Sequence, residues 1–376
     1  MTTFPNAEQI CSVKAPLSWD EKKNQLFVDA CREMALFHSQ NSPELRRLYE
    51  KKGFRPETLR SVADLSRIPY VGVTAMKYHL LTSQPEDRAV LKLTSSGTSG
   101  QKTQVWFDQG SLDRVQRMLD GLLEEEGLTS ARPTNYLLFN YDPREAGDLG
   151  TAYSQNNQLR FAPVKRVEYA IRKDEKGEWF FDKERTLRAL DAFALEGGPV
   201  RFLGMPAFLH DFLSYLGERR YRLDPESLLI YSGGWKASED KKTTKEEFRA
   251  LCGEKLGLPA SRVRDAYGLA EHSAPYYECE AHRFHVPVFN RLITRDPVTM
   301  EPTAPGERGV LELLTPFNAM MPTLAVLSTD WAVISEEPCP CGKNSPIFTI
   351  LGRAGISKHK GCALHAEDIL KKKAQT

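Results

Sequence analysis

Short apolar runs alternate with longer amphipathic stretches along this chain. The runs are only four or five residues long and contain mainly aliphatic and aromatic side chains, which is typical of buried strands. Strands that alternate with helices indicate an α/β fold. The runs that we expect to be strands are residues 136–140, 200–203, 228–231 and 310–314.

Three helices are expected between these strands. Ser111 can cap a helix whose apolar side chains lie on one face. The other two helices are expected over residues 206–216 and about 238–256. The apolar side chains of the first helix are Val115, Met118, Leu119, Leu122 and Leu123.

The chain is expected to form one large domain followed by a short tail. Proline and glycine cluster within residues 296–309, which predicts a hairpin loop between two strands. The segment that begins at Gly352 is basic and contains three consecutive lysines near its end. We therefore place the core domain at residues 1–351 and the tail at residues 352–376.

Composition and charge exclude several classes of protein. The 376 residues are 41% hydrophobic, enough for a substantial core, so a disordered chain is excluded. A formal net charge of +1 gives no broad positive field for nucleic acid. No apolar run is long enough to span a membrane, and the first residues lack a secretion signal. The seven cysteines are an odd number, which favours reduced thiols and a cytoplasmic location.

The first chemical signal is a loop rich in serine and glycine, Ser95-Ser-Gly-Thr-Ser-Gly-Gln-Lys102, between two strand-like runs. Glycines allow a tight turn that directs amide N–H groups at phosphate oxygens, and Lys102 adds a positive charge. The spacing differs from the Walker pattern. An ordinary hairpin turn is the alternative interpretation.

With four further segments, this loop resembles the adenylate-forming superfamily of acyl- and aryl-CoA ligases, luciferases and acyl-protein synthetases. The resemblance is closest to the acyl-protein synthetases of bacterial bioluminescence and to enzymes like phenylacetate–CoA ligase. The five matches follow the order of the superfamily between residues 94 and 353. The four further segments are Ser232-Gly-Gly-Trp235, Asp265-Ala-Tyr-Gly-Leu-Ala-Glu271, Ser328-Thr-Asp330 and Gly352-Arg353.

The resemblance implies the large α/β domain of that superfamily, with stacked sheets and helices, and a site for ATP and Mg²⁺. It implies that Lys102 and Glu271 are catalytic, with Glu271 holding Mg²⁺, and that Asp330 binds the ribose hydroxyls. Thr329 stands where relatives have glycine. The residues implied to bind the nucleotide are Ser95, Ser96, Gly97, Thr98, Ser99, Gly100, Ser232, Gly233, Gly234, Tyr267, Gly268, Asp330 and Arg353.

Each implied role also has an ordinary structural alternative. Glu271 follows a glycine turn and could reach a hard cation, or it could be a solvated carboxylate at the start of a helix. Asp330 follows the strand-like run 324–327 and could be a turn aspartate at the strand end. Arg353 could pair with a surface carboxylate.

A second signal is a set of three cysteines and one histidine. Cys339-Pro-Cys341-Gly is a tight turn that can direct two thiolates at one ion. Cys279 and His285 would complete a closed tetrahedral set, which is typical of structural zinc. His282 competes with His285 for the fourth position. Buried, separate cysteines are the alternative.

A third signal concerns the reaction. Longer relatives continue into a mobile domain that carries a catalytic lysine and the thiol acceptor site, and we expect that domain to be essentially absent here. Cys362 lies among Lys358, His359, Lys360 and His365, which should lower the pKa of its thiol and favour the nucleophilic thiolate. The arrangement resembles the cysteine of acyl-protein synthetases that accepts the acyl group as a thioester. Gly355-Ile-Ser357 departs from the hinge aspartate of longer relatives.

We therefore predict a ligase that activates a fatty or aromatic acid as acyl-adenylate and captures the acyl group on Cys362. The expected partners are a small carboxylic acid and an acceptor, which is a reductase, an acyl carrier protein or an amine; nucleic acid and membrane are not expected. Three alternatives remain: a ligase that uses CoA as the thiol, an ATP-independent transferase from acyl-CoA to a carrier protein, and a non-catalytic nucleotide-binding protein. Phe208 and Trp235 are candidates for the acyl pocket or the core, and His210 is expected to be a surface or core histidine.

Overall fold

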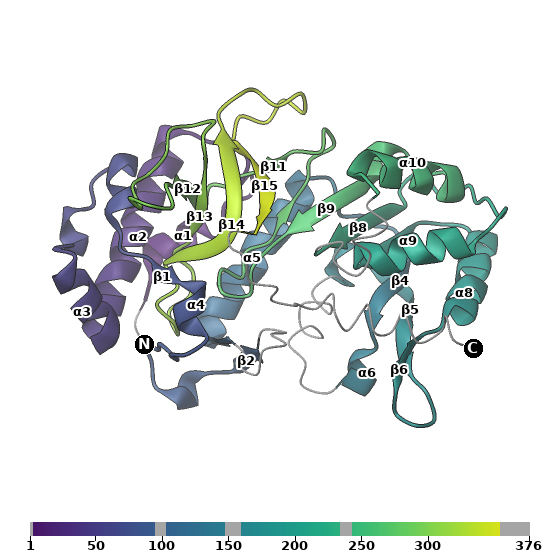
Figure 1. Ribbon diagram of the computed structural model, residues 1–376, viewed down its shortest axis with the longest axis horizontal. Helices are drawn as coiled ribbons and strands as arrows, with labels where there is room; N and C mark the ends of the chain where they lie inside the picture. The colour runs from purple at the N-terminus through teal and green to yellow at the C-terminus, as the bar shows by residue number, and fades with distance from the viewer. Residues whose placement is uncertain (1–2, 95–102, 147–158, 234–242, 354–376) are drawn as a thin grey trace. The chain divides into compact units, whose positions relative to one another are not determined.

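The computed structural model describes residues 3–94, 103–146, 159–233 and 243–353 (Figure 1). These residues form two compact units. Unit 1 consists of residues 3–94, 103–126 and 268–353, and unit 2 consists of residues 127–146, 159–233 and 243–267. Within the described residues, unit 2 therefore interrupts unit 1 once, between positions 126 and 268.

Unit 1 contains a mainly antiparallel sheet in the order β11-β15-β14-β13-β12, to which β1 adds in parallel beside β14. Strands β2 and β3 form a separate antiparallel hairpin, and β10 precedes β11. The strands of unit 1 are β1 (Val71–Gly72), β2 (Leu91–Thr94), β3 (Gln104–Phe107), β10 (Tyr276–Tyr277), β11 (Phe284–His285), β12 (Arg291–Arg295), β13 (Arg308–Leu314), β14 (Ala325–Ser335) and β15 (Ile347–Arg353).

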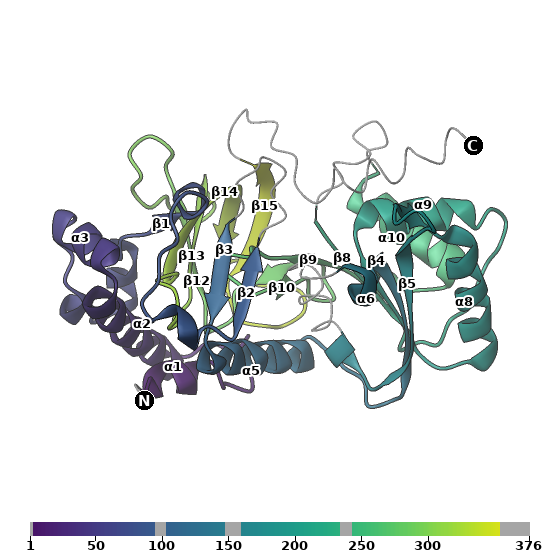
Figure 2. The same ribbon diagram turned by 90° about the horizontal axis from the view of Figure 1, so that it is seen from below.

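The helices of unit 1 come before unit 2 in the chain. Helices α1 and α2 pack together, and Figure 2 shows α5 running beneath the β2–β3 hairpin. The helices are α1 (Pro5–Ile10), α2 (Glu21–Asn41), α3 (Pro43–Lys51), α4 (Val73–Met76) and α5 (Gln109–Glu125), with 3-10 turns at Pro56–Thr58, Val62–Arg67 and Glu86–Arg88.

Arg291 connects the N-terminal helices of unit 1 to its sheet. Its guanidinium lies over the rings of Trp19 and Phe27, 3.7 and 4.5 Å from their centroids. Its Nη2 donates to Asn24 Oδ1 at 2.6 Å. The planar cation can stack on aromatic faces while donating in its own plane, so one side chain of β12 fixes the start of α2.

Unit 2 is a parallel sheet in the order β9-β8-β7-β4-β5, with β6 antiparallel at the edge. Helix α8 packs on β4 and β5, α9 on β8, and α10 on α9. The elements are β4 (Thr134–Tyr141), α6 (Pro143–Ala146), a 3-10 turn (Leu159–Phe161), β5 (Val164–Lys173), β6 (Trp179–Phe181), α8 (Lys183–Glu196), β7 (Val200–Gly204), α9 (Pro206–Tyr215), β8 (Leu228–Ser232), α10 (Lys245–Leu256), a 3-10 turn (Ala260–Arg262) and β9 (Val263–Tyr267).

The core of unit 2 forms between one face of the central strands and the apolar side chains of α8, α9 and α10. Residues on the other face of these strands are also buried, as expected for a parallel sheet. Gly204 ends β7 with φ 153°, and a Cβ there would lie 2.6 Å from the carbonyl oxygen of Phe139. Only glycine permits this approach of β7 to β4. The chain then turns into α9, whose Pro206 occupies the first turn.

The structure confirms the four predicted strands and the loop at 296–309, and it changes two helix starts. Asp108, not Ser111, caps α5, because its carboxylate accepts the N–H of Ser111 at 2.8 Å. Helix α10 begins at Lys245 rather than near residue 238, capped by Thr244. Helix α9 ends within one residue of its expected end. Across the described residues, no helix combines the length and the hydrophobicity needed to cross a bilayer.

Candidate functional site

The β2–β3 hairpin carries the serine- and glycine-rich loop. Thr94 of β2 is the register partner of Gln104 of β3, so residues 95–102 belong to the connection between these two strands in the sequence. Ser95, Ser96, Gly97, Thr98, Ser99, Gly100 and Lys102 lie outside the described residues. The strands on either side are nevertheless present as expected.

One edge of the unit 2 sheet brings together three of the predicted nucleotide residues. Ser232 ends β8 and pairs in register with Ala266, next to Tyr267 at the end of β9. Gly233 follows Ser232 and has φ 92°, a left-handed conformation that favours glycine. Ligands of parallel sheets bind at the carboxyl ends of strands, where these residues lie. Gly234 and Trp235 lie outside the described residues.

Glu271 lies in unit 1 in a short turn after the exposed Gly268. The turn contains no helix, and Glu271 is only 8% exposed, so the alternative of a solvated carboxylate at a helix start is wrong. Among the described residues its carboxylate has neither a hydrogen bond nor an ion pair. Its oxygens are not among the fully enclosed polar atoms of the described residues that lack a partner, so the carboxylate remains accessible to a cation.

Asp330 and Arg353 face each other in unit 1. They are register partners on β14 and β15, and Asp330 is 8% exposed. Asp330 lies in the middle of β14, so the alternative of a turn aspartate at a strand end is wrong. The N–H of Asp330 donates to Ser328 Oγ at 3.1 Å, which ties the backbone of this segment locally. An acidic and a basic side chain therefore lie side by side, as a ribose and phosphate site would require.

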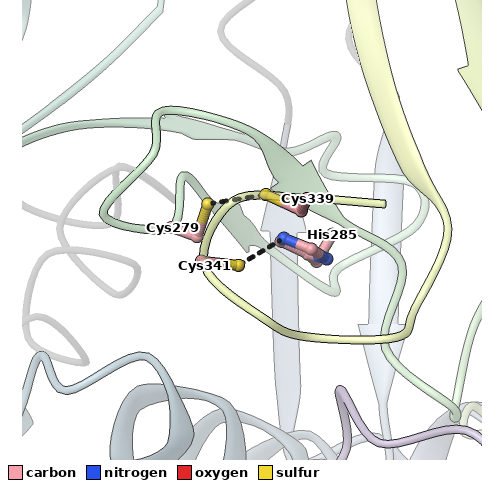
Figure 3. Close-up of side chains that lie close together, drawn as sticks. All are labelled: Cys279, His285, Cys339 and Cys341. Carbon is pink, nitrogen blue, oxygen red and sulfur yellow. Dashed lines mark hydrogen bonds between the residues drawn. The ribbon is translucent and has the colours of Figure 1, made fainter. Parts of the chain in front are cut away.

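Cys279, His285, Cys339 and Cys341 converge in unit 1 (Figure 3). Their ligand atoms all lie within 4.8 Å of one another. The Sγ atoms of Cys279 and Cys339 are 3.7 Å apart, and Cys341 Sγ lies 3.2 Å from His285 Nε2. Two sulfurs bound to one tetrahedral zinc at about 2.3 Å would be about 3.8 Å apart, so the set fits zinc in composition and spacing.

The second nitrogen of His285 faces a hydroxyl. His285 Nδ1 lies 2.8 Å from Ser345 Oγ, which leaves Nε2 toward the sulfurs. Burial lowers the pKa of His285 to about 4 and raises the pKa of Cys279 to about 12. His282 is instead 3.6 Å from Glu278, outside the cluster. Of the two competing histidines, the structure places His285 with the cysteines.

Two contacts around this cluster escape sequence reasoning. Ser345 orients His285, and Lys343 pairs with the buried Glu126 at 3.1 Å. The pKa of Lys343 is raised, although its burial opposes the shift, because the Glu126 carboxylate is close. Neither Ser345 nor Lys343 stands out in the sequence, because serine and lysine are common residue types and neither belongs to a recognisable motif.

Three further predicted residues are Cys362 of the tail, Phe208 and His210. Cys362 and its basic neighbours lie outside the described residues. Phe208 is fully buried and packs edge-on against Phe181, so it is a core residue here. His210 is half-buried, and its Nε2 lies 3.3 Å from Thr243 Oγ1.

Comparison with known proteins gives a consistent result. A family model described as "Acyl-protein synthetase, LuxE" matches residues 5–371. A long-chain-fatty-acid–luciferin-component ligase from Vibrio harveyi is 24% identical over 93% of this chain and 89% of its own length. The ligase of that name from Aliivibrio fischeri is 21% identical over 95% and 92%. A phenylacetate–coenzyme A ligase from Thermus thermophilus is 24% identical over 89% and 71%.

Solved structures agree with the predicted fold class. Structures of 2-hydroxyisobutyryl-CoA ligase superpose with TM-scores of 0.65, in an open conformation with its acyl-AMP and CoA, and 0.68, in the thioester-forming state. Sequence identity is 19% and 18%, and the alignments cover 90% and 91% of this chain and 76% and 70% of those chains. The α/β fold of an adenylate-forming ligase is therefore confirmed.

Proposed function

The chain belongs to the LuxE acyl-protein synthetase family of adenylate-forming enzymes, and from this we propose that it activates a carboxylic acid with ATP and holds the acyl group on Cys362. The first step joins a carboxylate oxygen of the acid to the α-phosphorus of ATP and releases pyrophosphate. In the second step the Cys362 thiolate attacks the carbonyl carbon and releases AMP. The acyl-thioester then passes to an acceptor.

The observation that carries the proposal is the burial of Glu271 without a partner among the described residues. An oxygen donor in that state suits Mg²⁺, the hard cation that accompanies ATP. When bound, the cation neutralises charge that develops on the phosphoryl oxygens. Glu271 would hold it, while Lys102 and the amides of residues 95–100 bind the phosphates.

The remaining nucleotide residues have distinct tasks in this proposal. Asp330 accepts hydrogen bonds from the ribose hydroxyls, and its register partner Arg353 contacts ribose or phosphate. The adenine lies against Tyr267 and is framed by the backbone of Ser232, Gly233, Gly234 and Gly268. The position of Ser232 and Tyr267 at the carboxyl edge of parallel strands supports this assignment.

Zinc is proposed as a structural ion held by Cys279, His285, Cys339 and Cys341. Three thiolates and one imidazole leave no open position, so the ion has no part in the reaction. It would connect the segment after Glu271 to the turn between β14 and β15, which carry Asp330 and Arg353.

The substrate acid and the acceptor are proposed by class. The relatives are named for long-chain fatty acids and for phenylacetate, which supports a fatty or aromatic acid. The acceptor is a reductase, an acyl carrier protein or an amine. A cytoplasmic location follows from the same proposal, because the Cys362 thiolate and the zinc thiolates need a reducing compartment.

A second candidate is a ligase that transfers the acyl group to CoA. The likeness to a phenylacetate–coenzyme A ligase over 89% of this chain favours it. Turnover that depends on CoA and survives Cys362→Ala would establish this candidate instead.

The test is pyrophosphate exchange with a panel of fatty and aromatic acids, followed by mass spectrometry. We expect exchange with one class of acid and an adduct on Cys362 that hydroxylamine removes. Cys362→Ala should keep the exchange and lose the adduct, because adenylation does not need the thiol. Cys252→Ala, at a buried cysteine in α10, is the control and should keep both. Absence of exchange with every acid would contradict the proposed activity.

A further inference from the structure

Three buried polar side chains lie behind the turn that carries Glu271. They are His272, Tyr276 and Asn290, and each is completely buried. None belongs to the nucleotide or zinc residues assigned above. Buried polar groups of this kind need hydrogen-bond partners. These three side chains bond to one another, while His272 Nδ1 and Asn290 Oδ1 have no partner among the described residues.

The turn itself is held in one conformation. The carbonyl oxygen of Leu269 accepts the N–H of Ser273 at 2.8 Å and that of His272 at 3.2 Å. Ser273 has φ 56°, a left-handed conformation that is unfavourable for residues other than glycine. Its hydroxyl donates to the carbonyl oxygen of Ala270 at 2.6 Å. Such a backbone persists only where its surroundings fix it.

The buried side chains are joined by two hydrogen bonds of 2.9 Å. Asn290 Nδ2 donates to the Tyr276 hydroxyl oxygen, and that hydroxyl also bonds to His272 Nε2. The rings of His272 and Tyr276 are nearly parallel, with an interplanar angle of 3°. His272 directly follows Glu271, so this chain of bonds ends at the residue beside the proposed cation ligand.

Tyr276 also contacts the sheet that carries the ribose residues. Its ring packs edge-on against Phe348 of β15, with centroids 5.0 Å apart. Strand β15 pairs with β14, where Asp330 lies. Tyr276 therefore bonds to the residue that follows Glu271 and also packs on β15, the strand that carries Arg353 and pairs with the strand of Asp330.

We propose that His272 and Tyr276 are positioning residues of the adenylation reaction, which fix the Glu271 turn so that its carboxylate is held ready for the divalent cation. This inference rests on the proposed role of Glu271. The structural reason is that Glu271 lacks a hydrogen bond of its own among the described residues, so no bond fixes its direction and the conformation of the turn that carries it becomes important. Groups that orient a metal ligand commonly change metal affinity about 10- to 100-fold when they are removed.

The experiment measures Mn²⁺ binding in the presence of ATP by electron paramagnetic resonance, independently of turnover. Tyr276→Phe deletes one oxygen and breaks both hydrogen bonds, and we expect it to weaken Mn²⁺ binding about 10-fold. Tyr136→Phe is the matched control, because Tyr136 is also fully buried and its hydroxyl bonds to Ala162. The control should keep the wild-type affinity.

Substitutions at His272 provide a second comparison. Glutamine can place its amide where Nε2 lies, so His272→Gln should retain Mn²⁺ binding that His272→Leu loses. Wild-type affinity in both Tyr276→Phe and His272→Leu would overturn the inference, and so would equal weakening in Tyr136→Phe.

Glu271→Gln distinguishes the proposed role of Glu271 from that of the two positioning residues. We expect it to abolish Mn²⁺ binding with ATP. If it binds Mn²⁺ like the wild type, the proposed role of Glu271 fails, and the inference about His272 and Tyr276 fails with it. If only Glu271→Gln is impaired, the role of Glu271 stands and the positioning residues are refuted.

Discussion

Burial controls how individual ionisable side chains of this protein titrate, and His38 is the clearest example. It lies in α2 without exposed surface, with Nδ1 2.8 Å from Ser83 Oγ. Burial lowers its pKa to about 3. The ring therefore stays neutral in the folded protein over the range in which an unfolded histidine, with a pKa near 6.5, becomes protonated.

This difference makes stability depend on pH. Because the unfolded chain binds a proton that folded His38 does not, the free energy of unfolding should fall as the pH falls below about 6.5 and continue to fall toward about 3. His38→Asn keeps an amide near Nδ1 and removes the titration. The wild type should then lose about 1.4 kcal/mol more than the variant for each pH unit.

Urea denaturation at pH 7.5 and pH 5.5 measures this difference. His79→Asn, at an exposed position, is the control and should keep the pH dependence of the wild type. If the free energy of unfolding changed equally with pH in the wild type and in His38→Asn, His38 would have to be protonated in the folded protein.

Single residues could be predicted from the sequence where the chain itself carries the pattern. Asp330 and Arg353 were singled out by motifs, and the structure makes them register partners. His272 gives no such signal, because the Tyr276 hydroxyl that bonds to it is held in turn by Asn290, 14 residues farther along the sequence, and only the folded chain brings the three together. The sequence does not distinguish Asp108 from Ser111 as the cap of α5, because both residue types are good caps. In the fold Asp108 caps the helix, and the Ser111 hydroxyl accepts the N–H of Ala319 instead.

At the scale of elements, the cysteine cluster joins two loops of unit 1. Cys279 and His285 come from β11 and the segment before it, and Cys339 and Cys341 come from the turn between β14 and β15. Because β11 and β15 are paired, a bound ion would close this corner of the sheet.

Loss of the metal should therefore loosen that corner. We expect Cys341→Ala to lower the zinc content to near zero and to lower Tm, by about 2–4 °C for each kcal/mol of lost stability. Cys11→Ala, at a buried cysteine of unit 1 outside the cluster, should keep its zinc. Elemental analysis and calorimetry measure both quantities. Zinc-free wild-type protein with the Tm of the zinc-loaded form would contradict this prediction.

Pairing of strands explains which histidine joins the cluster. His282 and His285 are both close to Cys279 in sequence, so spacing alone left the choice open. His285 faces Ile347 across β11 and β15, whereas His282 has φ 59° in the preceding turn and lies beside Glu278. The loop 296–309 can be predicted because proline and glycine mark it. The length of β14 cannot, because Ser328 and Thr329 do not continue the apolar pattern of a strand.

At the scale of the whole molecule, the part of unit 2 that the structure describes lies between positions 126 and 268 and has its own parallel sheet and core. We expect a fragment of residues 127–267 to fold by itself, since a domain with its own core can do so. A fragment of residues 3–126 should not, because β11 to β15 lie beyond it. Circular dichroism and urea titration test both fragments. An unfolded 127–267 fragment would refute this prediction.

The discontinuity of unit 1 also affects its synthesis. A ribosome completes α2 long before it adds Arg291, the side chain that covers Trp19 and Phe27. At ~5–20 residues per second, the 250 residues between the end of α2 at Asn41 and Arg291 take roughly 13–50 s. During that interval unit 2 can already be native while the nascent α2 exposes its apolar face, which makes the first hundred residues the natural target of a chaperone.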